Sequence, residues 1–293
     1  MDFEKNDYQD IDVRALVSGM NPKLAKRIPG FVYRYAEKIL HVDELNEHFR
    51  RTNDFTAEEF LDATVERLDI RIDMDKESLE ELEKNRGRRV MVVSNHPFGG
   101  PEAMGLMSIL IKIFPDIKLV AQSYLKIIKP LRSCCVFNKK EVRTLCDHVE
   151  EKKSVLIYPA GFCSRILSNG EIFDYRWKSS FLKIAKKLGM PVIVVHTYGQ
   201  LSKRIFRWTK FRKIFGIKVG IESAFLSDEM FKRVGETLKM RVAKTIEPEV
   251  FDDRYTLDEW SQKLRQFCFN LRDNPKEEFD PNIALTLPND KII

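Results

Sequence analysis

Short apolar runs rich in β-branched residues recur through the middle of the chain and constrain its fold more than any other feature. They occupy residues 89–94, 117–121, 154–159 and 191–196, with a weaker run at 133–137. Runs without polar alternation are typical of strands that are buried on both faces, as in a parallel sheet. The segments between them have the composition or spacing of helices, at 101–114, 139–152 and 177–188. The alternation predicts an α/β fold with a mixed, largely parallel sheet flanked by helices.

The two ends of the chain differ from this middle part. Residues 1–85 have apolar positions at helical spacing and predict a helical N-terminal region, with a capping box formed by Thr56 and Glu59. An α/β domain is expected over residues 86–272. The tail, residues 273–293, is polar and carries three prolines, so we expect it to lie loosely. Further elements expected in the domain are an edge strand and two helices, at 217–221, 227–246 and 256–272.

Composition bounds the class of protein. With 293 residues, of which 43% are hydrophobic, the chain can bury a sizeable core as one domain or two smaller ones. The net charge of +6 is too small to imply nucleic acid by itself. The five cysteines are odd in number and form no C-x-x-C pair, which argues against a disulfide scaffold and supports a zinc site only weakly. We therefore expect reduced thiols and a cytoplasmic location.

A membrane-spanning segment is not expected from the sequence. The N-terminus lacks the basic start and apolar run of a signal peptide. No stretch has the roughly 18 apolar residues that a spanning helix needs. If the protein meets a membrane, it lies on the surface, so we expect a peripheral location on the inner face of the cell membrane.

The first apolar run leads into Asn-His-Pro-Phe-Gly-Gly-Pro-Glu at 95–102. Loops at the carboxyl ends of such strands form the sites of open α/β folds. A proline suits the first helical position, which places Glu102 in the first turn, near His96. A carboxylate there can accept a hydrogen bond from one imidazole nitrogen and leave the other as a base for a hydroxyl. Gly99 and Gly100 allow the backbone to approach a bound group closely.

Each of these residues also has a structural interpretation. A glutamate in the first helical turn is favoured by the helix dipole alone. A histidine at the end of a strand is often a hydrogen-bonded structural residue. The residues in isolation therefore leave both interpretations open.

The segment resembles the signature of the glycerolphosphate acyltransferase (PlsC-like) superfamily, in which Asn-His is followed by Asp five residues after the histidine. Here Pro101 occupies that place and Glu102 follows it. The one-residue extension is similar to that of a bacterial branch labelled hemolysin, which reads Asn-His-Pro-Leu-Gly-Gly-Leu-Asp. O-acyltransferases that make glycine or ornithine lipids belong to this neighbourhood. The resemblance implies that His96 is the general base and that Glu102 is its orienting acid.

A second block agrees with this resemblance. Residues 158–165, Tyr-Pro-Ala-Gly-Phe-Cys-Ser-Arg, are similar to the branch's Phe-Pro-Ala-Gly-x-x-Ser-Arg and stand where the superfamily has Phe-Pro-Glu-Gly-Thr-Arg-Ser. Further matches follow at 170–174, 177–181 and 191–195. Ala160 replaces the glutamate that the superfamily is thought to use on a glycerol-phosphate acceptor. The resemblance therefore favours a hydroxyacyl aminolipid, of glycine or ornithine type, over lysophosphatidic acid.

Substrate-binding residues are expected in both blocks, at Asn95, Gly99, Gly100, Gly161, Ser164 and Arg165. Backbone N–H groups of these glycines are candidate oxyanion donors. The forked guanidinium of Arg165 suits a carboxylate or phosphate, but an ion pair with Asp174 explains this residue equally well. Lys178 is a weaker candidate for binding.

The implied reaction moves a fatty acyl group from a thioester to a hydroxyl of a lipid acceptor. Acyl carrier protein or coenzyme A would carry the acyl group, and no bound cofactor or metal is expected. The sequence has no Walker A, Gly-x-Gly-x-x-Gly or Gly-x-Ser-x-Gly motif. The alternatives are a 1-acylglycerol-3-phosphate acyltransferase and a non-catalytic lipid-binding protein. The second would not need an intact pair of His96 and Glu102.

Residues 203–215 combine six basic side chains and no acidic one with four aromatic side chains, Phe206, Trp208, Phe211 and Phe215. Such a segment suits an anionic membrane surface, where the aromatic rings would enter the headgroup layer. A nucleic-acid interface and a solvated face with core aromatics are the alternatives. A lipid substrate favours the membrane, so no nucleic-acid partner is expected. Residues 20–40 are a second candidate for membrane contact.

Other titratable residues are set aside. His41, His48 and His148 lie on predicted helices without the spacing of metal ligands. His196 ends the last apolar run, where it could share a crevice with His96 and contact substrate. Nothing near Cys163 in the sequence activates it as a nucleophile.

Overall fold

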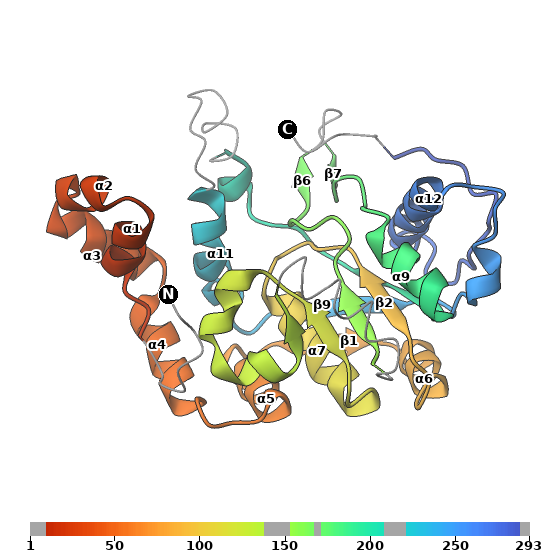
Figure 1. The fold of residues 1–293 in the computed structure, drawn as a ribbon, viewed down its shortest axis with the longest axis horizontal. Helices are drawn as coiled ribbons and strands as arrows, with labels where there is room; N and C mark the ends of the chain where they lie inside the picture. The colour runs from red at the N-terminus through yellow and green to blue at the C-terminus, as the bar shows by residue number, and fades with distance from the viewer. Residues whose placement is uncertain (1–9, 138–152, 167–170, 208–220, 288–293) are drawn as a thin grey trace.

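A seven-stranded sheet lies at the centre of the protein (Figure 1). The computed structural model describes residues 10–137, 153–166, 171–207 and 221–287. Within these ranges the sheet consists of Arg71–Met74 (β1), Met91–Ser94 (β2), Lys118–Val120 (β3), Cys135–Val136 (β4), Val155–Ile157 (β5), Val192–Thr197 (β8) and Thr237–Val242 (β9). Their order is β1-β9-β8-β2-β5-β3-β4, and β8 and β9 are the one antiparallel pair among them. The predicted mixed, largely parallel α/β sheet is confirmed.

Strand β2 lies in the middle of the sheet, between β8 and β5. Its side chains alternate between the two faces, as in any strand. Val92 belongs to the core under helix α7 (Pro101–Ile113), whereas Met91 and Val93 belong to the core under helix α12 (Leu257–Asn270). Burial on both faces explains why the run has no polar alternation. It also places the loop after β2 at the centre of the sheet's carboxyl edge.

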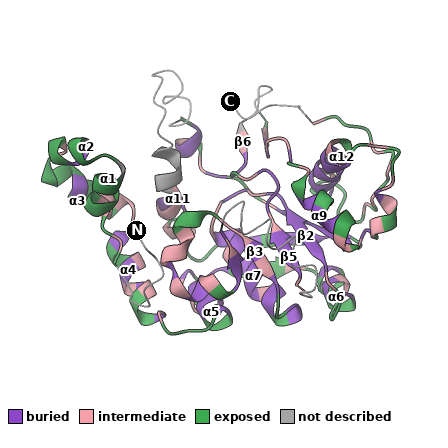
Figure 2. Cartoon of the chain, in the orientation of Figure 1, coloured by how far each residue is buried: buried purple, intermediate pink, exposed green. Residues whose placement is uncertain are grey.

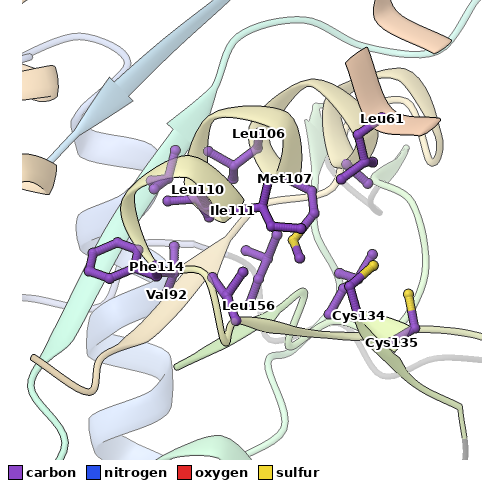
Figure 3. Packing of buried hydrophobic residues seen from close by; sticks show 14 of the residues in the cluster. Leu61, Val92, Leu106, Met107, Leu110, Ile111, Phe114, Cys134, Cys135 and Leu156 are labelled. Atoms are coloured by element: carbon purple, nitrogen blue, oxygen red, sulfur yellow. The ribbon is translucent and has the colours of Figure 1, made fainter. Parts of the chain in front are cut away.

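One face of the sheet is covered by α7 together with helix α5 (Ala57–Arg67). Figure 3 shows Leu106 and Leu110 of α7 among the side chains that pack with Val92 and Leu156 of the sheet. All four side chains are fully buried. Burying an aliphatic side chain of this size contributes about 1.5–3 kcal/mol, so this layer holds α7, and with it the start of the helix, firmly in place.

The opposite face is covered by α12 and by helix α9 (Ser180–Leu188). Trp177, Phe181 and Trp260 are the large buried side chains of this layer. Figure 2 shows α12 as mostly buried. The main-chain carbonyl of Trp177 accepts a hydrogen bond from the Gln262 side chain at 2.8 Å, which ties the segment before α9 to α12.

The tail after α12 covers this helix instead of lying loosely, and the expectation of a loose tail is wrong for residues 273–287. The ring of Phe279 lies 5.3 Å from the ring of Phe267, measured between centroids. The Gln266 side chain accepts a hydrogen bond from the N–H of Thr286 at 2.9 Å. Single apolar residues among polar ones thus find partners on α12, a contact that composition does not reveal.

The N-terminal region consists mainly of helices α1 (Val13–Met20), α2 (Pro22–Arg27), α3 (Gly30–Ile39), α4 (Val42–Arg51), α5 and α6 (Lys76–Lys84). In Figure 1, α1 to α3 extend farthest from the sheet, and Figure 2 shows them as largely exposed. The predicted capping box of Thr56 and Glu59 is present. An all-helical region is wrong in one place, because residues 71–74 form β1 and pair with β9.

The long helix predicted at 227–246 is wrong. Helix α11 (Ile221–Phe231) ends before a turn that contains Gly235, whose φ of +83° suits glycine. Strand β9 follows, with Leu238 and Met240 buried on either side of the exposed Lys239. The glycine and this period-two alternation were the sequence signals for a turn and a strand.

The remaining predicted strands and helices occur within a few residues of their expected bounds, where the structure describes them. The helix expected at 139–152 and most of the edge strand expected at 217–221 lie outside the described residues. Other short elements are an antiparallel pair, Arg165–Ile166 (β6) and Ile172–Phe173 (β7), and 3-10 helices at Ser123–Ile127, Lys129–Ser133 and Pro248–Val250.

Replacing Thr256 with alanine removes the capping box at the start of α12 and should lower the free energy of unfolding. The Thr256 hydroxyl accepts from the N–H of Glu259, whose carboxylate accepts from the N–H of Thr256 at 2.8 Å. Loss of an N-cap costs about 1 kcal/mol. Urea unfolding followed by circular dichroism measures the change, and Thr256→Ser is the matched control. An alanine variant as stable as the parent would contradict the role of this cap.

Candidate active site

The loop between β2 and α7 places a histidine beside a buried carboxylate. Nδ1 of His96 lies 3.0 Å from Oε1 of Glu102. The Glu102 side chain is fully buried in the first turn of α7, whereas the His96 side chain is 15% exposed. The same Oε1 accepts hydrogen bonds from the N–H groups of Phe98 at 2.9 Å and Gly99 at 2.8 Å. The loop therefore turns around one carboxylate oxygen.

The charge on Glu102 is set by two opposing effects. Burial opposes ionisation, but the neighbouring His96 and the amides of Gly99 and Phe98 hold the pKa of Glu102 below its ordinary value. The Nδ1–H of His96 is not directed along the line to Oε1, although the two atoms are at hydrogen-bonding distance. Such catalytic contacts often tighten when substrate binds.

The main chain of His96 is fixed by the segment that follows β5. The N–H of His96 donates to Oδ1 of Asp174 at 3.3 Å, and its carbonyl accepts from the N–H of Ser164 at 2.8 Å. The imidazole of His96 stacks on the ring of Tyr158, with centroids 4.2 Å apart and planes inclined by 30°. The Nε2 edge of the imidazole can then act as a base toward the solvent-facing side.

Asp174 links several parts of the site, a role that sequence reasoning missed. Its carboxylate is fully buried and also accepts from the Ser164 hydroxyl at 2.7 Å and the Trp177 indole at 3.0 Å. Burial raises the pKa of Asp174, although these donors favour its charged form. The sequence signals were its place in the further match at 170–174 and its possible ion pair with Arg165, and neither indicates these contacts.

Two of the predicted binding residues, Asn95 and Ser164, have internal partners. The Asn95 amide donates to the Thr197 carbonyl at 2.8 Å and accepts from the Thr197 N–H at 2.7 Å, joining β2 to β8. Ser164 is held by His96 and Asp174, as described above. Both side chains border a cavity of about 210 Å³, on the α12 side of β2. His96 does not line this cavity, and its ring packs instead on Tyr158, a residue of the core under α7.

The three glycines that were predicted to bind substrate lie in the loops around His96. Gly99 has a φ of +96°, and a Cβ there would lie 2.7 Å from the Cys163 sulfur. Its N–H is already used by Glu102, and the N–H of Gly161 donates to the Tyr158 carbonyl at 2.9 Å. Two of the three amides predicted as oxyanion donors thus have acceptors inside the protein, which leaves that of Gly100.

Arg165 and Asp174 both belong to the described residues, and they do not form the predicted ion pair. The guanidinium of Arg165 donates to the neighbouring Ser164 carbonyl at 3.3 Å. Lys178 is exposed and lies over the Phe162 ring, 6.0 Å from its centroid. Burial raises the pKa of Cys163 to about 12, so this residue is a thiol and not a nucleophilic thiolate.

His196 does not share a crevice with His96, so that expectation is wrong. Its side chain follows Val192 and Val194 in the alternation of β8 and faces α12. There Nδ1 lies 3.9 Å from the Cys268 sulfur, and the ring packs edge-on against Tyr198 at 4.7 Å. His196 is therefore a buried packing residue beside the cavity on the opposite face.

A family model described as Acyltransferase matches residues 15–274 of the chain. The chain belongs to this acyltransferase family. The family resemblance predicted from the sequence is confirmed, and so is its consequence that the protein is an acyltransferase.

Two relatives of this acyltransferase are named lyso-glycine lipid O-acyltransferase. The protein of Bacteroides thetaiotaomicron is 31% identical over 269 residues, which cover 89% of this chain and 97% of that protein. The protein of Phocaeicola vulgatus is 30% identical, with coverage of 89% and 95%. Among solved structures, the 1-acyl-sn-glycerophosphate (LPA) acyltransferase PlsC of Thermotoga maritima matches with a TM-score of 0.43 and 12% identity, over 83% of this chain and 93% of that one.

The described ranges of the acyltransferase contain no helix that is long and apolar enough to cross a membrane. In the same ranges, His, Cys, Asp and Glu side chains do not gather in any group of three or more that could hold a metal ion.

The basic aromatic stretch at 203–215 is described only up to Arg207. Phe206, predicted to enter the headgroup layer, is instead buried with Leu201, Ile205 and Cys163, so that prediction is wrong for this residue. Its three aromatic companions farther along lie outside the described residues. The spacing of the aromatic residues did not distinguish these outcomes, because the same spacing is compatible with packing on the core and with contact to a membrane.

Helix α11 closes the site on the α7 side, which the sequence did not predict. A Cβ on Gly99 would lie 3.3 Å from the Leu226 methyl groups, and one on Gly100 would lie 3.8 Å from the Met230 sulfur. The loop that carries His96 thus packs under apolar side chains of α11. The sequence analysis assigned part of α11 to the incorrect long helix at 227–246, and nothing in the sequence indicated that α11 lies over the loop.

Lowering the pH should destabilise the acyltransferase through His196. Burial, and then the nearby Arg272, lowers the pKa of His196 from 6.5 to about 4. The unfolded chain therefore binds a proton at higher pH than the folded chain, and the free energy of unfolding should fall as the pH falls from about 6.5 toward 4. The loss from this group is on the order of 3 kcal/mol.

Urea unfolding at pH 7, 6 and 5 measures this slope. His48, whose pKa is also lowered to about 4 by burial, contributes with the same sign and is present in both proteins compared. His196→Asn should therefore show a shallower slope than the parent. Equal slopes would mean that His196 is not buried in its neutral form.

Proposed function

We propose that this acyltransferase moves a fatty acyl group from a thioester to the hydroxyl of a lyso-glycine lipid. The observation that carries the proposal is the pairing of His96 with the buried Glu102 in a chain that is about 30% identical to two enzymes of that name. The match extends over nearly their whole length. His96 is the general base, Glu102 orients it, and an acyl carrier protein or coenzyme A thioester is the donor.

The geometry suits attack by a hydroxyl without an acyl-enzyme. With Nδ1 turned toward Glu102, Nε2 of His96 is free to take the proton of the acceptor hydroxyl as its oxygen attacks the thioester carbonyl. A C–O bond forms, the C–S bond breaks, and the thiolate leaves and recovers the proton from the imidazolium. The buried negative charge of Glu102 stabilises the imidazolium while it exists.

The second block supports an acceptor without a phosphate. Ala160 stands where the superfamily signature has glutamate, and its side chain is fully buried in the core under α12. A methyl group there offers no polar contact to a glycerol phosphate. The carboxylate of a glycine lipid is a smaller anion, which a single guanidinium can grip with two hydrogen bonds. Arg165, next to Ser164, is the candidate for this contact.

Acyl transfer by the purified protein tests this function. Labelled acyl donors on acyl carrier protein and on coenzyme A are supplied with an N-hydroxyacyl glycine or with lysophosphatidic acid. We expect a labelled diacyl product from the glycine acceptor and a loss of about 10²-fold or more in His96→Ala, as for removal of a general base. Glu102→Gln keeps an oxygen for the two amides but removes the charge, so its rate should also fall.

Transfer to lysophosphatidic acid alone would overturn the proposed acceptor. Transfer that His96→Ala leaves at the parent rate would overturn the proposed base. If neither acceptor is labelled, with liposomes present and the fold intact by circular dichroism, the lipid-binding alternative replaces catalysis.

We further propose that helices α1 to α3 contact an anionic membrane surface. Four large apolar side chains are exposed there, at 42% for Leu16, 65% for Phe31, 38% for Val32 and 65% for Tyr35. Exposed basic side chains surround them at Lys23, Lys26, Arg27, Arg34 and Lys38. Aromatic rings at the headgroup layer with basic side chains beside them are the features of surface-bound helices. Both substrates of the proposed reaction would be reached from that surface.

Flotation with vesicles tests this contact. The parent protein should float with vesicles that contain anionic lipid and less with neutral ones, and added salt should weaken binding. Phe31→Ser combined with Tyr35→Ser should remain in the unbound fraction. Leu79→Ser, which changes an apolar side chain of similar exposure (39%) on α6, is the matched control and should float like the parent. Equal flotation of all three proteins would assign the contact elsewhere.

A further inference from the structure

A buried hydroxyl beside His96 has no hydrogen-bond partner among the described residues. Tyr158 directly follows β5, its side chain is 7% exposed, and its ring stacks on the imidazole. The hydroxyl oxygen is covered by protein, yet no donor or acceptor lies within reach of it. Most buried polar groups are paired, so an unpaired one next to a reactive side chain indicates a ligand contact.

Packing alone does not explain this hydroxyl. The stacking on His96 and the contacts with the core under α7 involve the ring, and a phenylalanine would make them equally well. The motifs that this segment resembles begin with phenylalanine at this place. Burying a hydroxyl without a partner costs free energy. The hydroxyl of Tyr158 therefore lowers stability without any contact in the protein that offsets the cost.

The hydroxyl keeps its proton and can act as a hydrogen-bond donor. Burial, and then the negative charges of Glu102 and Asp174, raises the pKa of Tyr158 well above its ordinary value. The phenol therefore stays protonated. A neutral donor in a buried place stabilises a developing negative charge much better than it would in water.

The reaction needs such a donor, and two of the three glycine amides predicted for this role are engaged. As an acceptor oxygen attacks a thioester, negative charge develops on the carbonyl oxygen, and donors close to the base lower this barrier. The amides of Gly99 and Gly161 donate to Glu102 and to the Tyr158 carbonyl, respectively. The Tyr158 hydroxyl is a donor beside His96 that has no acceptor in the described part of the chain.

We propose that the Tyr158 hydroxyl donates a hydrogen bond to the carbonyl oxygen of the acyl thioester during attack. This assignment rests on the proposed acyl transfer with His96 as base. The proton of the acceptor moves to Nε2 of His96, the C–O bond forms, and the carbonyl oxygen becomes an oxyanion held by Tyr158. When the oxyanion collapses, the C–S bond breaks, and the thiolate takes the proton back from His96. Tyr158 keeps its own proton throughout.

The carbonyl of the acyl thioester would approach Tyr158 from the side of His96, whose side chain is partly exposed. The hydroxyl is covered in the unliganded protein, so the acyl chain must displace side chains to reach it. Leu226 and Met230 of α11 pack on the glycines of the same loop and are candidates for this displacement. A covered donor that substrate uncovers also stays dry until the reaction, which keeps its interaction strong.

Tyr158→Phe tests the proposal, because it removes only the hydroxyl. We expect kcat to fall by about 10- to 100-fold, somewhat less than for loss of a dedicated oxyanion donor, with KM for both substrates changed less than about twofold. The melting temperature should stay the same or rise, since an unpaired buried hydroxyl is removed. Tyr255→Phe is the matched control, because it removes a hydroxyl that donates to Asn282 on the far side of α12, and kcat should not change.

A second measurement separates carbonyl recognition from general damage. A thioether analogue of the donor lacks the carbonyl oxygen, so it should bind the parent and Tyr158→Phe equally well. Weaker binding of the analogue, or a change confined to KM, would overturn the assignment to the oxyanion. A Tyr158→Phe enzyme with the parent's kcat would overturn it as well, while His96→Ala, assayed beside it, reports separately on the proposed function.

Discussion

The site depends on one buried carboxylate oxygen, Oε1 of Glu102. Taking a carboxylate out of water costs several kcal/mol unless hydrogen bonds and a nearby charge offset the loss. Here the main-chain N–H groups of Phe98 and Gly99 bind the oxygen, and Nδ1 of His96 lies beside it. The loop must therefore wrap around the start of α7, and this wrapping fixes the imidazole. The left-handed backbone of Gly99 is what the turn requires.

A second carboxylate joins this loop to the rest of the carboxyl edge. Asp174 receives the N–H of His96 and the hydroxyl of Ser164, and Asn95 holds Thr197 of the neighbouring strand. Residues far apart in the sequence thus hold the main chain on both sides of His96. Ser164 of the second block and Asp174 thus serve first to position the histidine, which explains why these two side chains have partners inside the protein.

The central strands, α7 and the pairing of His96 with Glu102 were predictable from the sequence because each depends on local order. The signals were an apolar run, a proline at a helix start, and an acid in the first turn of the helix that follows the loop of the base. Sequence reasoning missed what depends on tertiary contacts. Asp174 and Tyr158 were visible only as members of a motif, since their contacts cross from one strand to another. Strand β9 was missed although its alternation was present, because the helical spacing of α11 was extended through Gly235. His196 was placed near His96 because strand alternation was not applied to both strands together.

The electrostatic arrangement favours a state that exists only during reaction. Two buried carboxylates, Glu102 and Asp174, lie close to one imidazole, and each pays a burial cost in the resting protein. In the proposed mechanism His96 becomes an imidazolium that attracts both carboxylates, so attraction offsets part of that cost as the proton is taken. The oxyanion that forms at the same moment is repelled by the same carboxylates. A neutral, protonated donor such as Tyr158 therefore suits this site. It stabilises the oxyanion by a hydrogen bond, whereas a cation in its place would also be attracted to the two carboxylates.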